Sequence, residues 1–81
     1  MKENIIIEAR VNIDTIDKVK EFCCLCSKCI DEVLVYSGRH IVSGKSFLGL
    51  LSLDLSKPLK VEFYGGIPYE VKEGMKKFIV N

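Results

Sequence analysis

The segment Gly44-Lys45-Ser46-Phe47-Leu48-Gly49-Leu50-Leu51-Ser52-Leu53 joins a polar turn to a short apolar run. Ser46 stands immediately before that run, where its hydroxyl oxygen would accept a hydrogen bond from an unpaired backbone N–H. Ser46 is therefore predicted to be the N-cap of a short helix. A helix of two turns can bury only one side, and the five apolar side chains in residues 47–53 exceed one stripe. Part of this apolar surface is expected to stay exposed and to serve as a contact site.

The segments on either side of this helix have the pattern of strands. Residues 33–36 and 40–43 favour strands, and residues 37–39 between them carry a hairpin signal. Residues 59–64 alternate as a half-buried strand does, and two consecutive glycines end the alternation. The centre of the chain is therefore predicted to form a hairpin, the short helix and a further strand.

The N-terminal part is predicted to hold a strand and a longer helix. Residues 5–9 have the apolar, β-branched character of a buried strand. Residues 11–15 are expected to form a loop that leads into the helix, with Asp14 or Thr15 as its cap. The apolar stripe of this helix, at three- and four-residue steps, is expected to consist of Ile16, Val19, Cys23, Cys26 and Ile30.

A last amphipathic helix is expected to run to the C-terminus. The predicted order is then strand, helix, strand, strand, short helix, strand, helix. This order favours a single α+β domain over residues 1–81, with a four-stranded antiparallel sheet, three helices on one face and the other face open to solvent. The apolar side chains expected along the last helix are Tyr69, Val71, Met75, Phe78 and Ile79.

Length, composition and charge exclude several classes of protein. The chain has 81 residues, enough for one small domain, and its 48% of hydrophobic residues support a packed core. The 12 basic and 11 acidic side chains nearly cancel and form no basic stripe, so nucleic acid is not an expected partner. No apolar run approaches the roughly 18 residues that cross a bilayer, and residues 1–7 are too short for a signal peptide. A cytoplasmic protein without membrane insertion is expected.

From residue 33 to residue 64 the sequence resembles the HPr family, the small phosphocarriers of the bacterial phosphoenolpyruvate-dependent sugar phosphotransferase system. The hairpin, the Lys45-Ser46 pair, Gly49 and the strand that follows fall where HPr has them. The element order extends this likeness to nearly the whole chain. The resemblance implies the HPr-like open-faced β-sandwich, and it implies that an ATP-dependent HPr kinase phosphorylates Ser46. The docking surface that it implies for protein partners consists of Lys45, Phe47, Leu48 and Leu51.

The resemblance does not extend to the phosphate-transfer motif of HPr. HPr carries a Gly-Leu-His-Thr-Arg-Pro-like motif at the start of its first helix, where the histidine accepts phosphate. The corresponding residues here are 12–17, and alignment places Asp14 or, without a gap, Thr15 at the histidine position. Neither alignment supplies a histidine or an arginine, and the single histidine, His40, is expected on the surface of a strand. Phosphohistidine transfer is therefore predicted to be absent, and the chain is not expected to be an enzyme.

A regulatory or binding role is the function that the resemblance then implies. A histidine-free paralogue of HPr that keeps the serine works only in regulation, and the present chain shares that combination. The partners implied are an HPr kinase, Enzyme I or a transcriptional regulator of carbon catabolism. The alternative within the family is a diverged carrier whose Asp14 accepts phosphate as an acyl phosphate.

The cysteines suggest a function of another class, namely thiol-based metal or redox binding. Cys23, Cys24, Cys26 and Cys29 lie within seven positions, too close together to staple distant segments as a disulfide framework does. On a helix Cys24 would point away from the others, so one tetrahedral ion could not easily be surrounded. A redox pair of Cys26 and Cys29 stays open, but packing as small hydrophobic side chains is favoured. No metal or cofactor is expected.

Overall fold

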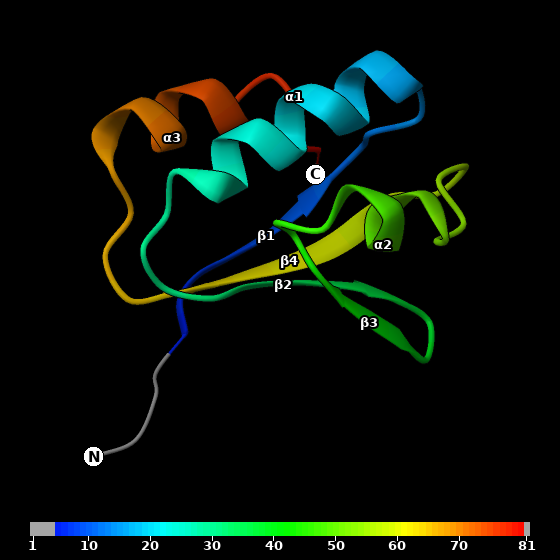
Figure 1. Ribbon diagram of the computed structural model, residues 1–81, viewed down its shortest axis with the longest axis horizontal. Coiled ribbons are helices and arrows are strands. Elements are labelled where there is room, and N and C mark those ends of the chain that lie inside the picture. Colours follow the sequence, from blue (N-terminus) through cyan, green and yellow to red (C-terminus); the bar gives the residue numbers. More distant parts are fainter. Residues whose placement is uncertain (1–4, 81) are drawn as a thin grey trace.

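The computed structural model describes the backbone of residues 5–80 and the side chains of residues 7–80. Residues 1–4, which belong to the stretch considered as a signal peptide, lie outside the described residues. Within the described chain, four strands and three helices follow one another (Figure 1). Their bounds are β1 Ile5–Val11, α1 Ile16–Ser27, β2 Val33–Ser37, β3 His40–Ser43, α2 Phe47–Leu51, β4 Leu59–Tyr64 and α3 Tyr69–Met75.

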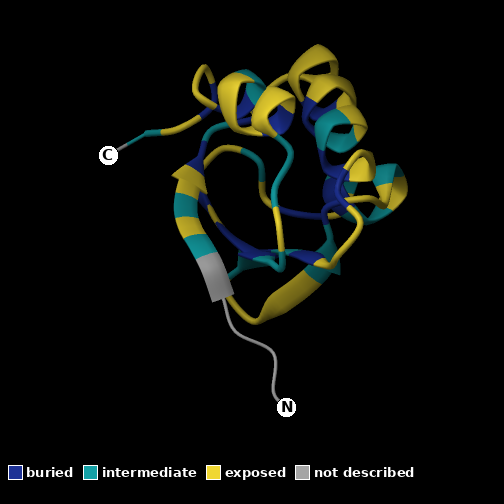
Figure 2. Cartoon of the chain, turned by 90° about the vertical axis from the view of Figure 1, so that its left-hand side faces the viewer, coloured by how far each residue is buried: buried dark blue, intermediate teal, exposed yellow. Residues whose placement is uncertain are grey.

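The strands form one antiparallel sheet in the order β1-β4-β2-β3. A two-residue turn joins β2 to β3, since Ser37 pairs with His40, and Gly38 takes the positive φ of 59° that this turn needs. All three helices lie on one side of the sheet, with α1 and α3 side by side and α2 near β3 (Figures 1 and 2). The expected α+β class and the four-stranded antiparallel sheet are confirmed.

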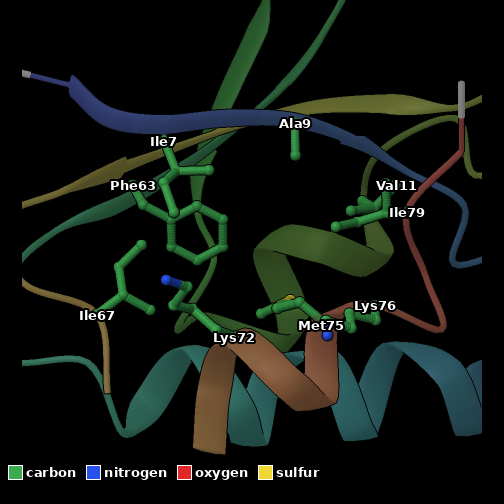
Figure 3. Close-up of a pocket in the computed structure, with 9 residues that line it drawn as sticks. All are labelled: Ile7, Ala9, Val11, Phe63, Ile67, Lys72, Met75, Lys76 and Ile79. Carbon is green, nitrogen blue, oxygen red and sulfur yellow. The ribbon is translucent and has the colours of Figure 1, made fainter. Parts of the chain in front are cut away.

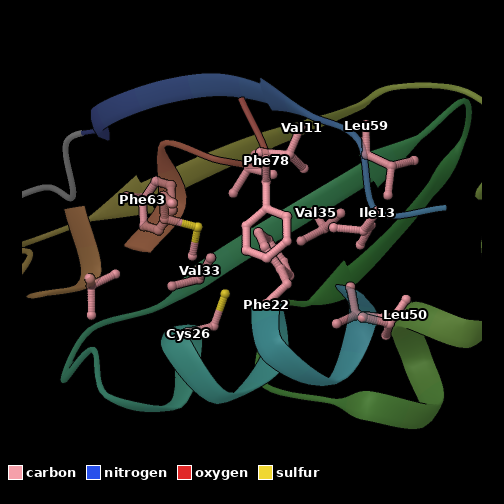
Figure 4. Packing of buried hydrophobic residues seen from close by; sticks show 14 of the residues in the cluster. Val11, Ile13, Phe22, Cys26, Val33, Val35, Leu50, Leu59, Phe63 and Phe78 are labelled. Atoms are coloured by element: carbon pink, nitrogen blue, oxygen red, sulfur yellow. The ribbon is translucent and has the colours of Figure 1, made fainter. Parts of the chain in front are cut away.

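The core lies between the helices and the sheet, and the surfaces that face it are buried (Figures 2 and 4). Phe22 of α1 and Phe78 near the C-terminus meet edge to face, with ring centroids 6.0 Å apart. Such aromatic pairs add to the free energy gained by removing apolar surface from water. The inward side chains of the two central strands complete this layer: Val33, Val35, Leu59, Val61 and Phe63.

The apolar stripe of α1 differs from the predicted one. Ile16 is 57% exposed and Ile30 is 91% exposed, so the prediction that both are buried is wrong. The helix ends at Ser27, which leaves Ile30 in the following turn, and Phe22 takes the central place because it meets Phe78. The side chains of this segment that are buried are Val19, Phe22, Cys26 and Cys29.

The C-terminal helix is shorter than predicted. α3 ends at Met75, and the chain then turns so that Ile79 forms an isolated antiparallel bridge with Val11 of β1. Phe78 is buried from this turn, whereas Tyr69 is 75% exposed at the start of the helix and Ile79 is 46% exposed. The prediction of a helix to the C-terminus is wrong because backbone pairing with the edge strand replaces the last helical turn.

Gly44, immediately after β3, marks the closest approach of the hairpin to α1. Its N–H donates to the carbonyl oxygen of Val33 at 2.8 Å, which extends the β2–β3 pairing by one residue. A Cβ at this position would lie 2.8 Å from Cys26 Sγ and 2.9 Å from Val33 Cγ1. Glycine is therefore required here by packing, because α1 and β2 leave no room for a methyl group.

We expect Gly44→Ala to lower the free energy of unfolding by about 1 to 3 kcal/mol, because an extra methyl group overpacks the core. Urea denaturation followed by circular dichroism measures the change. Gly66→Ala is the matched control, because a Cβ there meets nothing within 4 Å. Equal stability of the two variants would contradict this account of Gly44.

No helix within the described residues has the length and apolar character that a membrane span needs.

Candidate functional site

Ser46 caps α2, as predicted. Its backbone is extended, with φ −103° and ψ 105°, and its Oγ accepts a hydrogen bond from the N–H of Gly49 at 3.1 Å. Leu50 N–H donates to the carbonyl oxygen of Ser46 at 3.0 Å and starts the helical hydrogen-bond pattern. A Cβ on Gly49 would lie 3.0 Å from Ser46 Oγ, so glycine keeps this space free for the hydroxyl. Ser46 itself is exposed and accessible from solvent.

The predicted docking residues around Ser46 divide into two groups. Leu48 is 77% exposed and Lys45 is exposed, whereas Phe47 and Leu51 are half-buried against the core. Leu50, on the inner side of the helix, is fully buried. The helix thus presents one apolar side chain outward, next to the serine that caps it.

Ile16, which was expected in the apolar stripe of α1, adds exposed apolar surface. It is the first residue of α1, a helix that packs against α2. In the alignment that places Asp14 at the histidine of HPr, Ile16 falls where HPr has an arginine. Single exposed apolar residues are common on protein surfaces. Ile16 and Leu48, however, lie on two helices that pack against each other, α1 and α2.

The start of α1 has the geometry of an ordinary capped helix. Thr15, not Asp14, is the N-cap: its Oγ1 accepts from the N–H of Lys18 at 3.2 Å. Asp14 Oδ1 instead pairs with Lys18 Nζ at 3.0 Å, and this hydrogen bond lowers the pKa of the Asp14 carboxyl. His40 is exposed at the first position of β3, on the sheet rather than at this helix. Asp14 and Thr15, the two residues that align with the histidine of HPr, thus both accept hydrogen bonds from Lys18 at this helix start.

The four cysteines are free thiols in different environments. Cys26 and Cys29 are buried, Cys23 is half-buried and Cys24 is exposed. Burial raises the pKa of Cys26 strongly and that of Cys29 to a smaller extent, which keeps both thiols protonated and weakly nucleophilic. Within the described residues, no three His, Cys, Asp or Glu side chains are arranged to hold a metal ion. The environment of Cys26 and Cys29 favours packing over redox chemistry.

The open face of the sheet carries a buried carboxylate that was not predicted from the sequence. The side chain of Glu62 in β4 is only 8% exposed, and its Oε1 accepts from Tyr36 Oη at 2.7 Å and from Tyr64 Oη at 2.9 Å. Lys60 Nζ lies 3.3 Å from Glu62 Oε2 and 4.9 Å from the centroid of the Tyr36 ring. These hydrogen bonds lower the pKa of Glu62 and raise that of Tyr64 to about 12.

The alternation of β4 was the signal that could have indicated this network. Lys60, Glu62 and Tyr64 are two residues apart and therefore share one face of the strand. Tyr36 joins them only because β2 pairs with β4 so that Tyr36 lies opposite Lys60. That register results from the pairing of the two strands, and it cannot be predicted from the spacing of these residues in the sequence.

Comparison with known proteins gives no family for this chain. No protein-family model matches its sequence, and a search of curated proteins finds no match. Within the described residues, Lys45, Ser46 and Leu48 are exposed at the start of α2, close together in the chain, and the Lys45 ammonium donates to the carbonyl oxygen of Ile30 at 3.4 Å. The start of α1 and the cysteine segment at its end are separate features.

Ser46→Ala is expected to lower the free energy of unfolding by about 1 kcal/mol, because it removes the acceptor for the Gly49 N–H. Ser46→Asp is expected to restore most of the loss, since Asp is an equally good N-cap. Urea denaturation of the three proteins measures both effects. A stability of Ser46→Ala equal to that of the native chain would contradict the capping role.

Thiol labelling tests the placement of the cysteines. Under native conditions a maleimide is expected to modify Cys24 fastest and Cys26 slowest, because Cys26 is buried and its thiol pKa is raised. Time-resolved mass spectrometry of digested samples gives the rate for each site. Cys24→Ser should remove the fast phase, whereas equal rates at Cys24 and Cys26 in the folded protein would overturn the assignment.

Glu62→Gln tests the open-face network through its pH dependence. The folded-state pKa of Glu62 is lowered, so its stabilising effect is complete above the unfolded-state pKa and is lost as the pH falls through the folded-state value. We expect the variant to be less stable at neutral pH and to lose less stability than the native chain between about pH 5 and pH 3.

The urea midpoint as a function of pH is the measurement for Glu62. Glu8→Gln is the control, because it removes a carboxylate of the same sheet face whose side chain is 54% exposed. If the urea midpoint of Glu62→Gln fell with decreasing pH as much as that of the native chain, the Glu62 carboxylate would not contribute to the acid sensitivity of the fold.

Proposed function

We propose that this chain is an HPr-like regulatory module in which phosphorylation of Ser46 controls the binding of a protein partner to α2. The observation that carries the proposal is the exposed serine N-cap, whose Oγ lies 3.1 Å from the N–H of Gly49 and one residue from a lysine. The element order, which is the one HPr has, supports the family assignment. The resemblance of residues 33–64 to HPr is the other support.

A phosphate on Ser46 would change the charge of the α2 surface. The dianion would stand at the start of the helix, where backbone N–H groups and the ammonium of Lys45 favour negative charge. Leu48, 77% exposed on the same helix, would supply the apolar part of the contact. A partner with a basic group beside an apolar recess would then bind the phosphorylated form more tightly than the unmodified one.

In this proposal the chain has no phosphohistidine transfer and no catalysis of its own. Asp14 or Thr15 stands where HPr has its histidine; the Asp14 carboxylate is paired with Lys18 at 3.0 Å, and the Thr15 hydroxyl caps α1. Two carboxylates, Asp14 and Asp17, flank the helix start and would repel a phosphoryl donor. Partners of the HPr type, an HPr kinase and a carbon-catabolite regulator, are therefore proposed in place of a phosphate relay.

Intact-mass measurement after incubation with an HPr kinase and ATP tests the proposal. We expect one phosphate on the native chain and none on Ser46→Ala. Thr15→Ala is the matched control, because it also removes the hydroxyl cap of an exposed helix start and should leave phosphorylation unchanged. A native chain without phosphate, or a phosphate that persists in Ser46→Ala, would refute Ser46 as the switch.

A parallel incubation with Enzyme I and phosphoenolpyruvate separates the regulatory role from the carrier role. The regulatory proposal predicts no added phosphate. A hydroxylamine-labile phosphate that disappears in Asp14→Asn would instead show the acyl-phosphate chemistry of a diverged carrier.

A further inference from the structure

An apolar cavity of about 180 Å³ lies between the edge strand β1 and α3 (Figure 3). It is on the side of the sheet that carries the helices, away from α2 and Ser46. Its wall comes from β1, from the end of β4 and from α3 and the chain that flanks it. The apolar residues that line it include Ile7, Ala9, Phe63, Ile67, Met75 and Ile79.

The cavity exists because a small side chain stands where the strand faces a short helix. Ala9 projects from β1 into this space between Ile7 and Val11, which share its face of the strand (Figure 3). α3 ends at Met75, and the chain beyond it returns to β1 only at Val11, through the bridge with Ile79. Among the described side chains, none fills the space opposite Ala9.

Two lysines of α3 complete the lining of this otherwise apolar cavity. Lys76 Nζ is paired with Glu73 at 3.1 Å. Lys72 is exposed, has no ion-pair partner among the described residues, and extends along the Phe63 side of the cavity (Figure 3). An unpaired ammonium at the rim of an apolar space is complementary to a ligand that has an apolar chain and one negative charge.

We propose that this cavity binds a medium-chain alkyl carboxylate, with the alkyl chain beside Ala9 and Met75 and the carboxylate at Lys72. The volume fits this class of ligand: an apolar cavity of about 150 Å³ binds benzene, so 180 Å³ holds an alkyl chain of similar or slightly larger size. The site is separate from α2, and the proposal does not depend on phosphorylation of Ser46.

Titration of the native chain with octanoate, followed by methyl NMR, is the first test. We expect a dissociation constant on the order of 1 mM, with the largest shifts at the methyl groups of Ala9, Met75 and Ile79. The methyl groups of Leu48 and Leu34, in α2 and on the open face of the sheet, are internal references. Absence of saturable shifts, or equal shifts at all of these methyl groups, would overturn the proposal.

Two substitutions separate the apolar and the charged parts of the site. Ala9→Leu fills the space beside the strand and is expected to weaken octanoate binding at least tenfold; Ala9→Val, which adds less volume, should weaken it less. Lys72→Gln is expected to weaken octanoate binding roughly threefold but to leave binding of neutral octanol unchanged. Lys20→Gln is the control, because Lys20 is an exposed lysine of α1 that does not line the cavity.

The variant data can also refute the assignment. Unchanged octanoate affinity in a folded Ala9→Leu or Ala9→Val variant would place the ligand elsewhere. An equal loss of octanoate affinity in Lys72→Gln and Lys20→Gln would show that the effect comes from the net charge of the protein and not from a contact between Lys72 and the carboxylate.

Discussion

The pairing of β4 with β1 on one side and β2 on the other is the constraint on which the rest of the structure depends. β4 is the last strand in the chain, yet it lies between the first two strands, so the sheet cannot be completed until residues 59–64 are present. Its inward side chains, Val61 and Phe63, form the floor of the core under α1. Its outward Glu62 gathers two tyrosine hydroxyls and a lysine on the open face. A slip of one residue would exchange these two faces.

The candidate functional site is built on the rim of this core by the shortest helix. Burial of Leu50 sets the rotation of α2, and that rotation directs Leu48 to solvent. Ser46 caps the helix and is exposed beside Leu48, so a modification of its hydroxyl alters a surface that is also partly apolar. At the start of α1, by contrast, Thr15 caps the helix and Asp14 pairs with Lys18. Both helix starts combine a capping hydroxyl with an exposed apolar side chain, Leu48 on α2 and Ile16 on α1. They differ in the charge before the cap, which is the ammonium of Lys45 at α2 and the carboxylate of Asp14 at α1.

The predictions that succeeded are those that depend on neighbouring residues. The Ser46 cap, the hairpin turn at Gly38 and the end of β4 before Gly65 and Gly66 are set within a few residues of the chain. The α1 stripe and the C-terminal helix were assigned wrongly for a common reason. Phe78 contacts Phe22, and the chain beyond α3 pairs with β1. These contacts between distant residues determine which side chains are buried, and the periodicity of the sequence does not. The cavity opposite Ala9 also depends on the return of the chain beyond α3 to β1.

The sequence by itself therefore determined the α+β class, the nature of most elements and the capping role of Ser46, because hydrogen bonds and turns of this kind form within short segments. It also determined that neither Asp14 nor Thr15, the residues that align with the phosphate-accepting histidine of HPr, is a histidine. Only the tertiary structure decided which cysteines are buried, that Glu62 is enclosed by Tyr36 and Tyr64, and that an apolar cavity opens beside Lys72. These features depend on contacts between residues that are far apart in the chain. Such contacts require a particular register of the strands and a particular rotation of the helices, and both are fixed only when the sheet and the helices pack around one core.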